Sequence, residues 1–330
     1  MLSTDMGALI DACGRKIDYL RLSVTDRCDL RCAYCMPEDY ADYEAPGHWL
    51  SFDEIERLTG IFVSLGVTRI RLTGGEPLLR GRIVELVAKL RRHSGLSDLS
   101  LSTNGTRLAR MAARLKSAGV DRINVSLDTL SRSRFLALTR RDALGDVLAG
   151  LEEARNCGFT PIKINMVWLP DFNGDEIGAM IEYCMDKGFV LRLIENMPMS
   201  DSARALGTGS LQALIESLRK RYDLVDHVLP GGGPARYLTT PDNIFSIGFI
   251  TPVSQHFCAT CNRIRLTVDG ALHLCLGQED RLELRHLLRT GASDSDLIDA
   301  IQSAMQRKPD RHEFSNSSHK LVRVMASTGG

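Results

Sequence analysis

Cys28-Asp29-Leu30-Arg31-Cys32-Ala33-Tyr34-Cys35 directly follows the apolar run 17–24, which is the first predicted strand. Three thiols lie within these eight residues, and no fourth thiol or imidazole follows in the loop to complete a zinc site. Three thiolates on a tight loop suit a cubic iron–sulfur cluster, whose normal complement is four cysteines, with one iron left open. The spacing therefore favours an iron–sulfur cluster. A partial zinc site and three unrelated buried thiols are the alternatives.

Short β-branched runs alternate with amphipathic stretches between residues 17 and 198. The predicted strands are 17–25, 67–74, 99–103, 122–128, 161–167 and 190–197, and the predicted helices are 51–65, 83–93, 108–118, 146–157 and 174–187. Six βα units imply a parallel sheet but are too few for an eight-stranded barrel. We therefore expect an α/β fold with a partial, open (β/α)6 TIM-like barrel. Its active site should lie at the carboxyl ends of the strands, where the cysteine loop begins.

The alternation ends near residue 200, where a helix at 210–221 and short strands at 237–239 and 244–250 are expected. The sequence therefore predicts two regions. Residues 1–200 form the partial barrel with the first cysteine set. Residues 201–330 form a C-terminal extension that closes the open side of the barrel and carries a second cysteine set.

The second cysteine set consists of Cys258, Cys261 and Cys275, and it is again one ligand short of a closed site. A zinc site with His256 or His273 as the fourth ligand is as compatible with this spacing as an iron–sulfur cluster. The residues alone leave both interpretations open.

Arg263 and Arg265 lie on one face of a short predicted strand that begins two residues after Cys261. Two guanidinium groups beside an open iron suit an anion such as a triphosphate, or a purine edge. A solvated strand face is the alternative for this pair.

The composition excludes several classes of function. Forty-one basic and 41 acidic residues balance, so nothing indicates a nucleic acid or a membrane surface as partner. No stretch approaches the ~18 apolar residues of a membrane span. Nine cysteines without a secretory signal indicate reduced thiols, and we expect a cytoplasmic protein.

Several motifs occur together along the chain. They include Gly14-Arg15, the segment 20–28, Tyr34-Cys35-Met36-Pro37, 69–77, 102–105, Asn124-Val-Ser-Leu-Asp128, Lys163-Ile-Asn165, Glu195-Asn-Met-Pro198, 257–266 with Cys275, and the terminal Gly329-Gly330. The Cys-x3-Cys-x-aromatic-Cys spacing resembles the radical S-adenosylmethionine (radical SAM) enzymes. The whole set, from about Gly14 to the last residue, resembles the GTP 3′,8-cyclase (molybdenum cofactor biosynthesis protein A) family.

This resemblance implies a lyase that cyclises GTP to (8S)-3′,8-cyclo-7,8-dihydroguanosine 5′-triphosphate, the first step of molybdenum cofactor biosynthesis. In that family a 4Fe–4S cluster splits SAM, the 5′-deoxyadenosyl radical abstracts the ribose 3′ hydrogen, and the carbon radical attacks guanine C8. The implied partners are GTP, SAM, an external electron donor and the next enzyme, cyclic pyranopterin monophosphate synthase. A homodimer is left open.

The resemblance also implies site residues. Two 4Fe–4S clusters would be held, the first by Cys28, Cys32 and Cys35, the second by Cys258, Cys261 and Cys275. The SAM site would be lined by Tyr34, Gly75, Ser126 and Met197. GTP would contact Arg21, Arg71, Ser102, Lys163, Arg263 and Arg265. The catalytic set would comprise Arg263, Arg265, Gly329 and Gly330. The alternative for the two terminal glycines is a frayed chain end.

Further residues carry weaker expectations. Glycines at 74 and 75 would let the backbone approach a ligand closely, and Glu76 is either a partner of the SAM ammonium or a turn residue. Arg69 and Arg192 are weaker candidates to join Arg21, Arg71 and Lys163 at the triphosphate, and a surface or ion-paired role suits either of them at least as well. Asp29 and Ser102 stand where the family pattern has Asn and Thr, and Ser keeps the hydroxyl.

Two rival functions remain from the sequence. A radical SAM peptide maturase usually carries more C-terminal cysteines than the three present here and lacks the paired arginines. A zinc-bearing binding module would be colourless and would not cleave SAM.

Overall fold

The computed structural model describes residues 7–207, 209–314 and 325–329, and twelve strands form a single sheet. The six strands of the predicted βα units lie next to one another in chain order and are all parallel. They are β1 (Tyr19–Ser23), β2 (Arg69–Thr73), β3 (Asp98–Thr103), β4 (Arg122–Ser126), β5 (Ile162–Trp168) and β6 (Val190–Glu195). The predicted partial (β/α)6 barrel is confirmed, with strand ends displaced by up to two residues.

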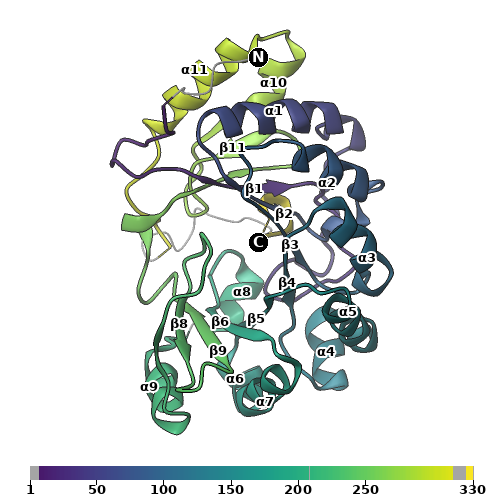
Figure 1. Ribbon diagram of the computed structural model, residues 1–330, viewed down its shortest axis with the longest axis vertical. Helices are drawn as coiled ribbons and strands as arrows, with labels where there is room; N and C mark the ends of the chain where they lie inside the picture. Colours follow the sequence, from purple (N-terminus) through teal and green to yellow (C-terminus); the bar gives the residue numbers. More distant parts are fainter. Residues whose placement is uncertain (1–6, 208, 315–324, 330) are drawn as a thin grey trace.

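The helices lie along the outside of the curved sheet (Figure 1). They are α1 (Phe52–Ser64), α2 (Ile83–Arg91), α3 (Leu108–Ala118), α4 (Arg132–Thr139), α5 (Leu144–Asn156) and α7 (Ile177–Lys187). Ser51 begins α1 with a capping box, as its Ser-x-x-Glu sequence predicts. Helix α4 was not predicted from the sequence, and residues 174–176, predicted as the start of α7, form a separate 3-10 turn.

The C-terminal extension lengthens the sheet at both edges. Strand β10 (Arg263–Leu266) pairs in parallel with β1, and β9 (Ser246–Ile250) pairs in parallel with β6. Antiparallel hairpin strands then follow outward on each side: β11 (Ala271–His273) and β12 (Arg281–Glu283), and β8 (Arg236–Thr239) and β7 (Val225–His227). The parallel part of the sheet is therefore wider than the sequence predicted, because the extension adds one parallel strand to each edge.

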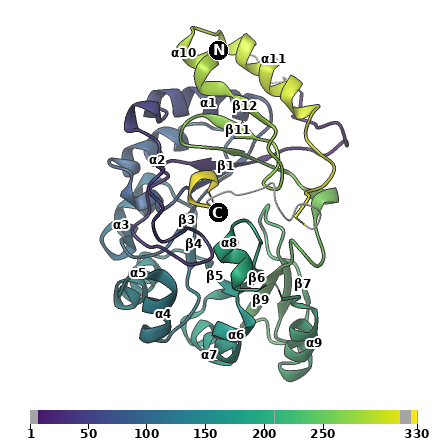
Figure 2. The ribbon, with the colours of Figure 1, turned by 180° about the vertical axis from the view of Figure 1, so that it is seen from behind.

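The extension also contains helices. Its helices are α8 (Asp201–Ala205), α9 (Gln212–Arg221), α10 (Leu284–Arg289), α11 (Asp294–Met305) and α12 (Met325–Thr328). Both views place the short yellow helix α12 inside the curve of the sheet (Figures 1 and 2). None of the helices in the described parts of the chain is long and apolar enough to cross a membrane.

Successive side chains along each strand point alternately into the hydrophobic core and onto the inner face of the sheet. On β1, Leu20 and Leu22 are fully buried in the hydrophobic core, and Arg21 between them points to the opposite face. Strands β2 and β10 repeat this pattern. Arg21 is in register with Arg71 on one side and with Arg265 on the other. The sheet thus places three guanidinium groups side by side on its inner face.

Candidate active site

Two cavities adjoin on the inner face of the sheet. The first cavity contains the first cysteine set, and the second cavity contains the second set. Residues that line both cavities are Ser102, Asn165, Ile194, Met197 and Met325. The two cysteine sets, more than 200 residues apart in sequence, therefore face neighbouring spaces.

The three cysteines of the first set are half-buried and line one cavity. Burial raises the pKa of Cys28 to about 12 and that of Cys35 to about 11, and it raises the pKa of Cys32 well above its usual range. A coordinating thiol is deprotonated by the metal itself. The Cys28 sulfur also accepts hydrogen bonds from the Leu30 N–H (3.5 Å) and the Asn104 amide (3.7 Å). Buried sulfurs that accept N–H donors fit the ligands of an iron–sulfur cluster.

All four residues expected at the SAM site line the first cavity. They are Tyr34, Gly75, Ser126 and Met197. The Tyr34 hydroxyl donates to Asp128 at 2.8 Å, and the other oxygen of that carboxylate accepts from the Val167 N–H at 2.8 Å. Burial raises the pKa of Asp128 to about 6. Asp128 therefore fixes Tyr34 against β5, a role that the sequence analysis did not assign.

The two glycines after β2 line the first cavity and also meet a steric requirement of the backbone. A Cβ on Gly74 would lie 2.2 Å from the Thr25 carbonyl oxygen, and one on Gly75 would lie 2.3 Å from that of Arg27. Gly74 also has a φ of +140°, which other residues rarely adopt. Both positions need glycine because a side chain there would collide with the backbone at Thr25 and Arg27, which leads into the cysteine loop.

Glu76 is a buried structural residue in this chain. Its carboxylate accepts hydrogen bonds from the Leu78 N–H (2.9 Å), the Thr103 hydroxyl (2.7 Å) and the Asn104 N–H (2.6 Å). Burial raises its pKa to about 7. Glu76 does not line either cavity, so the turn-residue interpretation fits its contacts better than a partner for the SAM ammonium.

The charge of Asp29 is compensated locally. Its carboxylate accepts hydrogen bonds from the Asn104 amide (2.8 Å), the Thr106 hydroxyl (2.9 Å) and Arg141 (3.1 Å). Arg107 lies 3.7 Å away. Asp29 therefore links the cysteine loop to the loop after β3, and the nearby arginines Arg107 and Arg141 compensate its charge.

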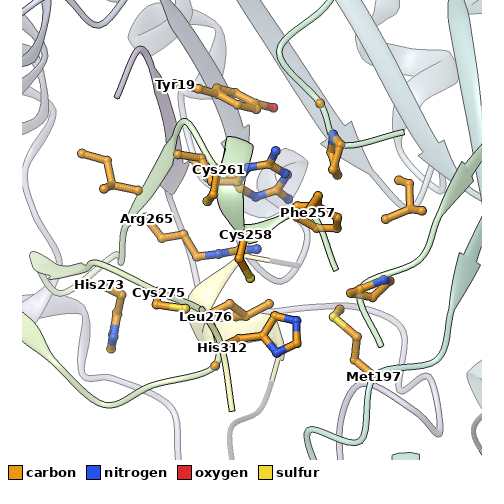
Figure 3. A pocket seen from close by; sticks show the side chains of 18 of the residues that line it. Tyr19, Met197, Phe257, Cys258, Cys261, Arg265, His273, Cys275, Leu276 and His312 are labelled. Carbon is orange, nitrogen blue, oxygen red and sulfur yellow. The ribbon is translucent and has the colours of Figure 1, made fainter. Parts of the chain in front are cut away.

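The second cavity brings together Cys258, Cys261 and Cys275 with Arg263 and Arg265. Figure 3 shows the three cysteine side chains grouped near Arg265, with Tyr19 above and His312 below. His273 lines the same cavity and His256 does not. Within the described residues, no three His, Cys, Asp or Glu side chains are gathered closely enough to hold a single ion.

The charges around the second set favour a thiolate at Cys261, whereas burial raises the pKa of Cys258. Burial alone would raise the pKa of Cys261, but the positive charges of Lys308 and Arg263 outweigh it and lower the pKa below its usual range. A stabilised thiolate is the form that binds metal. These residues fit an iron–sulfur cluster as well as the first set does.

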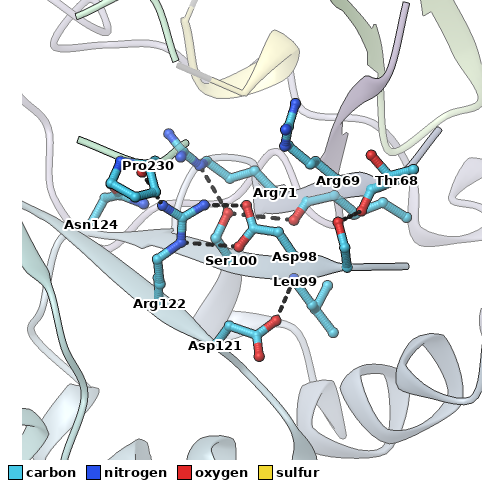
Figure 4. A network of polar contacts seen from close by, with 12 residues as sticks. Thr68, Arg69, Arg71, Asp98, Leu99, Ser100, Asp121, Arg122, Asn124 and Pro230 are labelled. Atoms are coloured by element: carbon cyan, nitrogen blue, oxygen red, sulfur yellow. Dashed lines mark hydrogen bonds and ion pairs between the residues drawn. The ribbon is translucent and has the colours of Figure 1, made fainter. Parts of the chain in front are cut away.

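In the described parts of the chain, Arg21, Arg71 and Arg265 form no ion pair with a carboxylate. Burial, together with the charge of Arg265, lowers the pKa of Arg21. Burial and the charge of Arg263 lower the pKa of Arg265 to about 10. Arg71 donates to the Ser100 hydroxyl at 3.2 Å (Figure 4). Buried, mutually repelling cations are costly unless an anion joins them, so this group is suited to bind one.

A third cavity continues from the second and shares Arg71, Arg192 and Gly233 with it. Lys163 lines this third cavity, where its ammonium donates to the Tyr237 hydroxyl at 3.1 Å. Burial, followed by the charge of Arg192, lowers the pKa of Lys163 to about 7. The predicted GTP contacts are therefore spread over two connected spaces, with Lys163 in the third cavity alone.

The two weaker cationic candidates differ in their surroundings. Arg69 forms an ion pair with Asp18 at 2.7 Å and lines none of the three cavities. Arg192 is 3% exposed, donates to the Asn124 side chain and lines two cavities. Arg122, which the sequence analysis did not consider, pairs with Asp98 and holds the glycine-rich loop through the Pro230 carbonyl at 3.1 Å (Figure 4).

The C-terminal tail reaches the inner face of the sheet. The Gly329 carbonyl accepts hydrogen bonds from Arg265 and from the Arg21 Nε at 3.3 Å. A Cβ on Gly329 would lie 2.5 Å from the Thr73 methyl group. The Met325 N–H donates to the Cys35 carbonyl at 3.4 Å, so the tail touches both cysteine regions. Gly330 lies outside the described residues.

Several lining residues gave no signal in the sequence. Examples are Tyr19, Lys308 and His312. Each resembles an ordinary core or surface residue in its own segment, and only the tertiary fold brings it to the cavity.

Comparison with known proteins defines the class first. Residues 22–184 match the Radical SAM superfamily, and residues 189–314 match Molybdenum Cofactor Synthesis C. The solved structure of Streptococcus suis SuiB bound to S-adenosylmethionine is similar in fold, with a TM-score of 0.57 and 14% identity. The match covers 87% of this chain and 64% of SuiB. The cysteine sets and the fold are thus those of a radical SAM protein.

Curated relatives then identify the family. A GTP 3′,8-cyclase of Erythrobacter litoralis is 47% identical, and the match covers 98% of each chain. GTP 3′,8-cyclase 1 of Pseudomonas aeruginosa is 46% identical over 97% of this chain and 99% of that protein. The chain belongs to the GTP 3′,8-cyclase family, which confirms the resemblance drawn from its motifs.

Proposed function

We propose that this chain is a radical SAM lyase that cyclises GTP to (8S)-3′,8-cyclo-7,8-dihydroguanosine 5′-triphosphate, the first step of molybdenum cofactor biosynthesis. Its cofactors are two 4Fe–4S clusters and SAM. One observation carries the proposal: two sets of three cysteines face adjoining cavities, with a row of arginines on the inner face of the sheet beside the second set. This is the arrangement needed to bring a SAM-derived radical to an anionic substrate.

When bound, the first cluster and SAM supply a 5′-deoxyadenosyl radical. The chain's own residues orient the reactants and exclude water. Tyr34, held by Asp128, lines the wall of the SAM site together with Ser126 and Met197. Ser102, which lines both cavities, would contact the ribose between the SAM site and the second cysteine set.

The substrate would extend across the second and third cavities. The guanine base would lie beside Cys258, Cys261 and Cys275, with Arg263 and Arg265 as its polar neighbours. The triphosphate would then lie near Arg71, Lys163 and Arg192, which line the third cavity. Their buried positive charges support this placement, because a triphosphate supplies the anion that they lack.

Other parts of the proposal concern organisation and partners. Residues 1–200 would act as the SAM-cleaving barrel, and residues 201–330 as the extension with the second cluster. An external electron donor would reduce the clusters, and the product would pass to cyclic pyranopterin monophosphate synthase. Nine free cysteines support a reducing, cytoplasmic location. Homodimer formation is left open.

Deletion of Gly329 and Gly330 tests the proposal directly. The parent chain, reconstituted anaerobically with iron and sulfide, should convert GTP to the cyclised triphosphate, identified by its mass spectrum. The truncated chain should retain its iron and lose at least about 100-fold in product formation, because it lacks the carbonyl between Arg21 and Arg265.

Lys220→Met, at an exposed position of α9, serves as the control. It should leave product formation unchanged. An unimpaired C-terminal truncation would disprove the role of the tail. A parent chain with both clusters that forms no cyclised product would disprove the function.

A further inference from the structure

Lys308 is a buried cation beside the second cysteine set, in the segment that follows α11. It is 4% exposed and lines the second cavity together with Cys258, Cys261 and Cys275. Its ammonium donates to the Arg263 carbonyl at 3.1 Å and to the Leu274 carbonyl. Arg263 lies two residues after Cys261, and Leu274 directly precedes Cys275. One side chain therefore connects the backbones of two cysteine-bearing segments.

No carboxylate forms an ion pair with Lys308 in residues 7–207, 209–314 and 325–329. A buried ammonium with only carbonyl partners is costly, because carbonyl dipoles replace only part of its hydration. Arg263 and Arg265, which line the same cavity, add further positive charge. The groups in this cavity that become anionic on metal binding are the three thiols.

Arg15 fixes the position of the Lys308 segment. Its guanidinium donates to the Cys258 carbonyl (2.8 Å) and to the carbonyls of Pro309 (2.6 Å) and Asp310 (2.9 Å). Arg15 has its own carboxylate partner in Asp11, at 2.6 Å. The turn directly after Lys308 is thereby fastened to the loop of Cys258. Together, Lys308 and Arg15 form hydrogen bonds with the backbone beside all three cysteines of the second set.

We propose that Lys308 is a positioning residue that compensates the charge of the second cluster and raises its reduction potential. The inference rests on the second cluster of the proposed function. Reduction adds one electron, and hence one negative charge, to a cluster that three thiolates already make anionic. A fixed positive charge in the same buried cavity stabilises the reduced form more than the oxidised form.

The test is a redox titration of the reconstituted full-length chain, monitored by electron paramagnetic resonance, with dithionite as the reductant. Lys308→Met removes the charge at similar length, Lys308→Gln keeps a hydrogen-bond donor without the charge, and Lys308→Arg keeps the charge. Lys220→Met, at an exposed position of α9, is the matched control. Iron and sulfide contents establish that each chain carries both clusters.

In Lys308→Met and Lys308→Gln, the equilibrium constant for reducing the second cluster should fall about tenfold, which is about 59 mV for one electron. The first cluster should be unchanged, and Lys308→Arg should titrate like the parent chain. If Lys308→Met and Lys308→Gln lose the second cluster while Lys308→Arg retains it, the result also supports compensation of the cluster's charge by Lys308.

Two results would overturn the inference. One is a second-cluster potential in Lys308→Met and Lys308→Gln equal to that of Lys220→Met. The other is loss of the second cluster from all three variants, because Arg keeps the charge. A parent chain that binds only one cluster would instead contradict the proposed function, and this is seen before any variant is compared.

Discussion

Cys32→Ala is expected to abolish SAM cleavage, with a fall of at least about 10³-fold in 5′-deoxyadenosine formation. Cys32 is the middle thiol of the first set, and it lines the first cavity together with Cys28 and Cys35. Loss of one of three ligands removes the iron site that binds SAM, and the large acceleration of a radical enzyme is lost with it. The second set does not involve this residue, so its cluster should remain.

The matched control is Cys157→Ala. Cys157 is also a free thiol, but it follows α5 on the outside of the barrel and lines none of the three cavities. The measurements are iron per chain and 5′-deoxyadenosine formed under dithionite. We expect Cys32→Ala to hold about half of the iron, and Cys157→Ala to match the parent. SAM cleavage at the parental rate in Cys32→Ala would contradict the assignment of the first set.

Arg263→Ala is expected to lower kcat/KM for GTP cyclisation by about 100-fold. Its guanidinium lies over the Phe257 ring (5.2 Å to the centroid), and its Nε has no partner in the part of the chain that the structure describes. The side chain is therefore held in place while a donor remains free for substrate. Hydrogen bonds to charged groups contribute about 1.5–3 kcal/mol, which corresponds to a loss of about 10–150-fold.

Arg281→Ala provides the control for Arg263. Arg281 lies on β12 of the same sheet, is exposed, and pairs with Glu283 outside the three cavities. It should cyclise GTP like the parent chain. Both variants should retain two clusters by iron content. An Arg263→Ala chain with both clusters and unchanged kcat/KM would show that this arginine does not bind the substrate.

The barrel and the cysteine loop were predictable because their signals are local. Alternating apolar residues define β1 and β2, glycines mark helix ends, and the three thiols of the first set occupy one loop. The side-by-side placement of Arg21 and Arg71 also follows from parallel pairing at equal register.

The parts of the fold and of the site that could not be predicted depend on contacts between segments that are distant in the sequence. Nothing local predicts that β10 pairs in parallel with β1, which is what brings Arg265 next to Arg21. Lys308 and Asp128 likewise acquire their roles from partners more than 30 residues away. Gly74 was correctly selected as special, but the backbone that it must avoid comes from another segment of the chain.

The most direct test of the central claim is the nucleotide dependence of SAM cleavage. The parent chain, reconstituted anaerobically and reduced, would be given SAM with GTP, with ATP or with no nucleotide, and 5′-deoxyadenosine would be measured. We predict that GTP strongly increases 5′-deoxyadenosine formation and that ATP does not. Equal SAM cleavage under all three conditions, without a cyclised product, would contradict the assignment of GTP as the substrate.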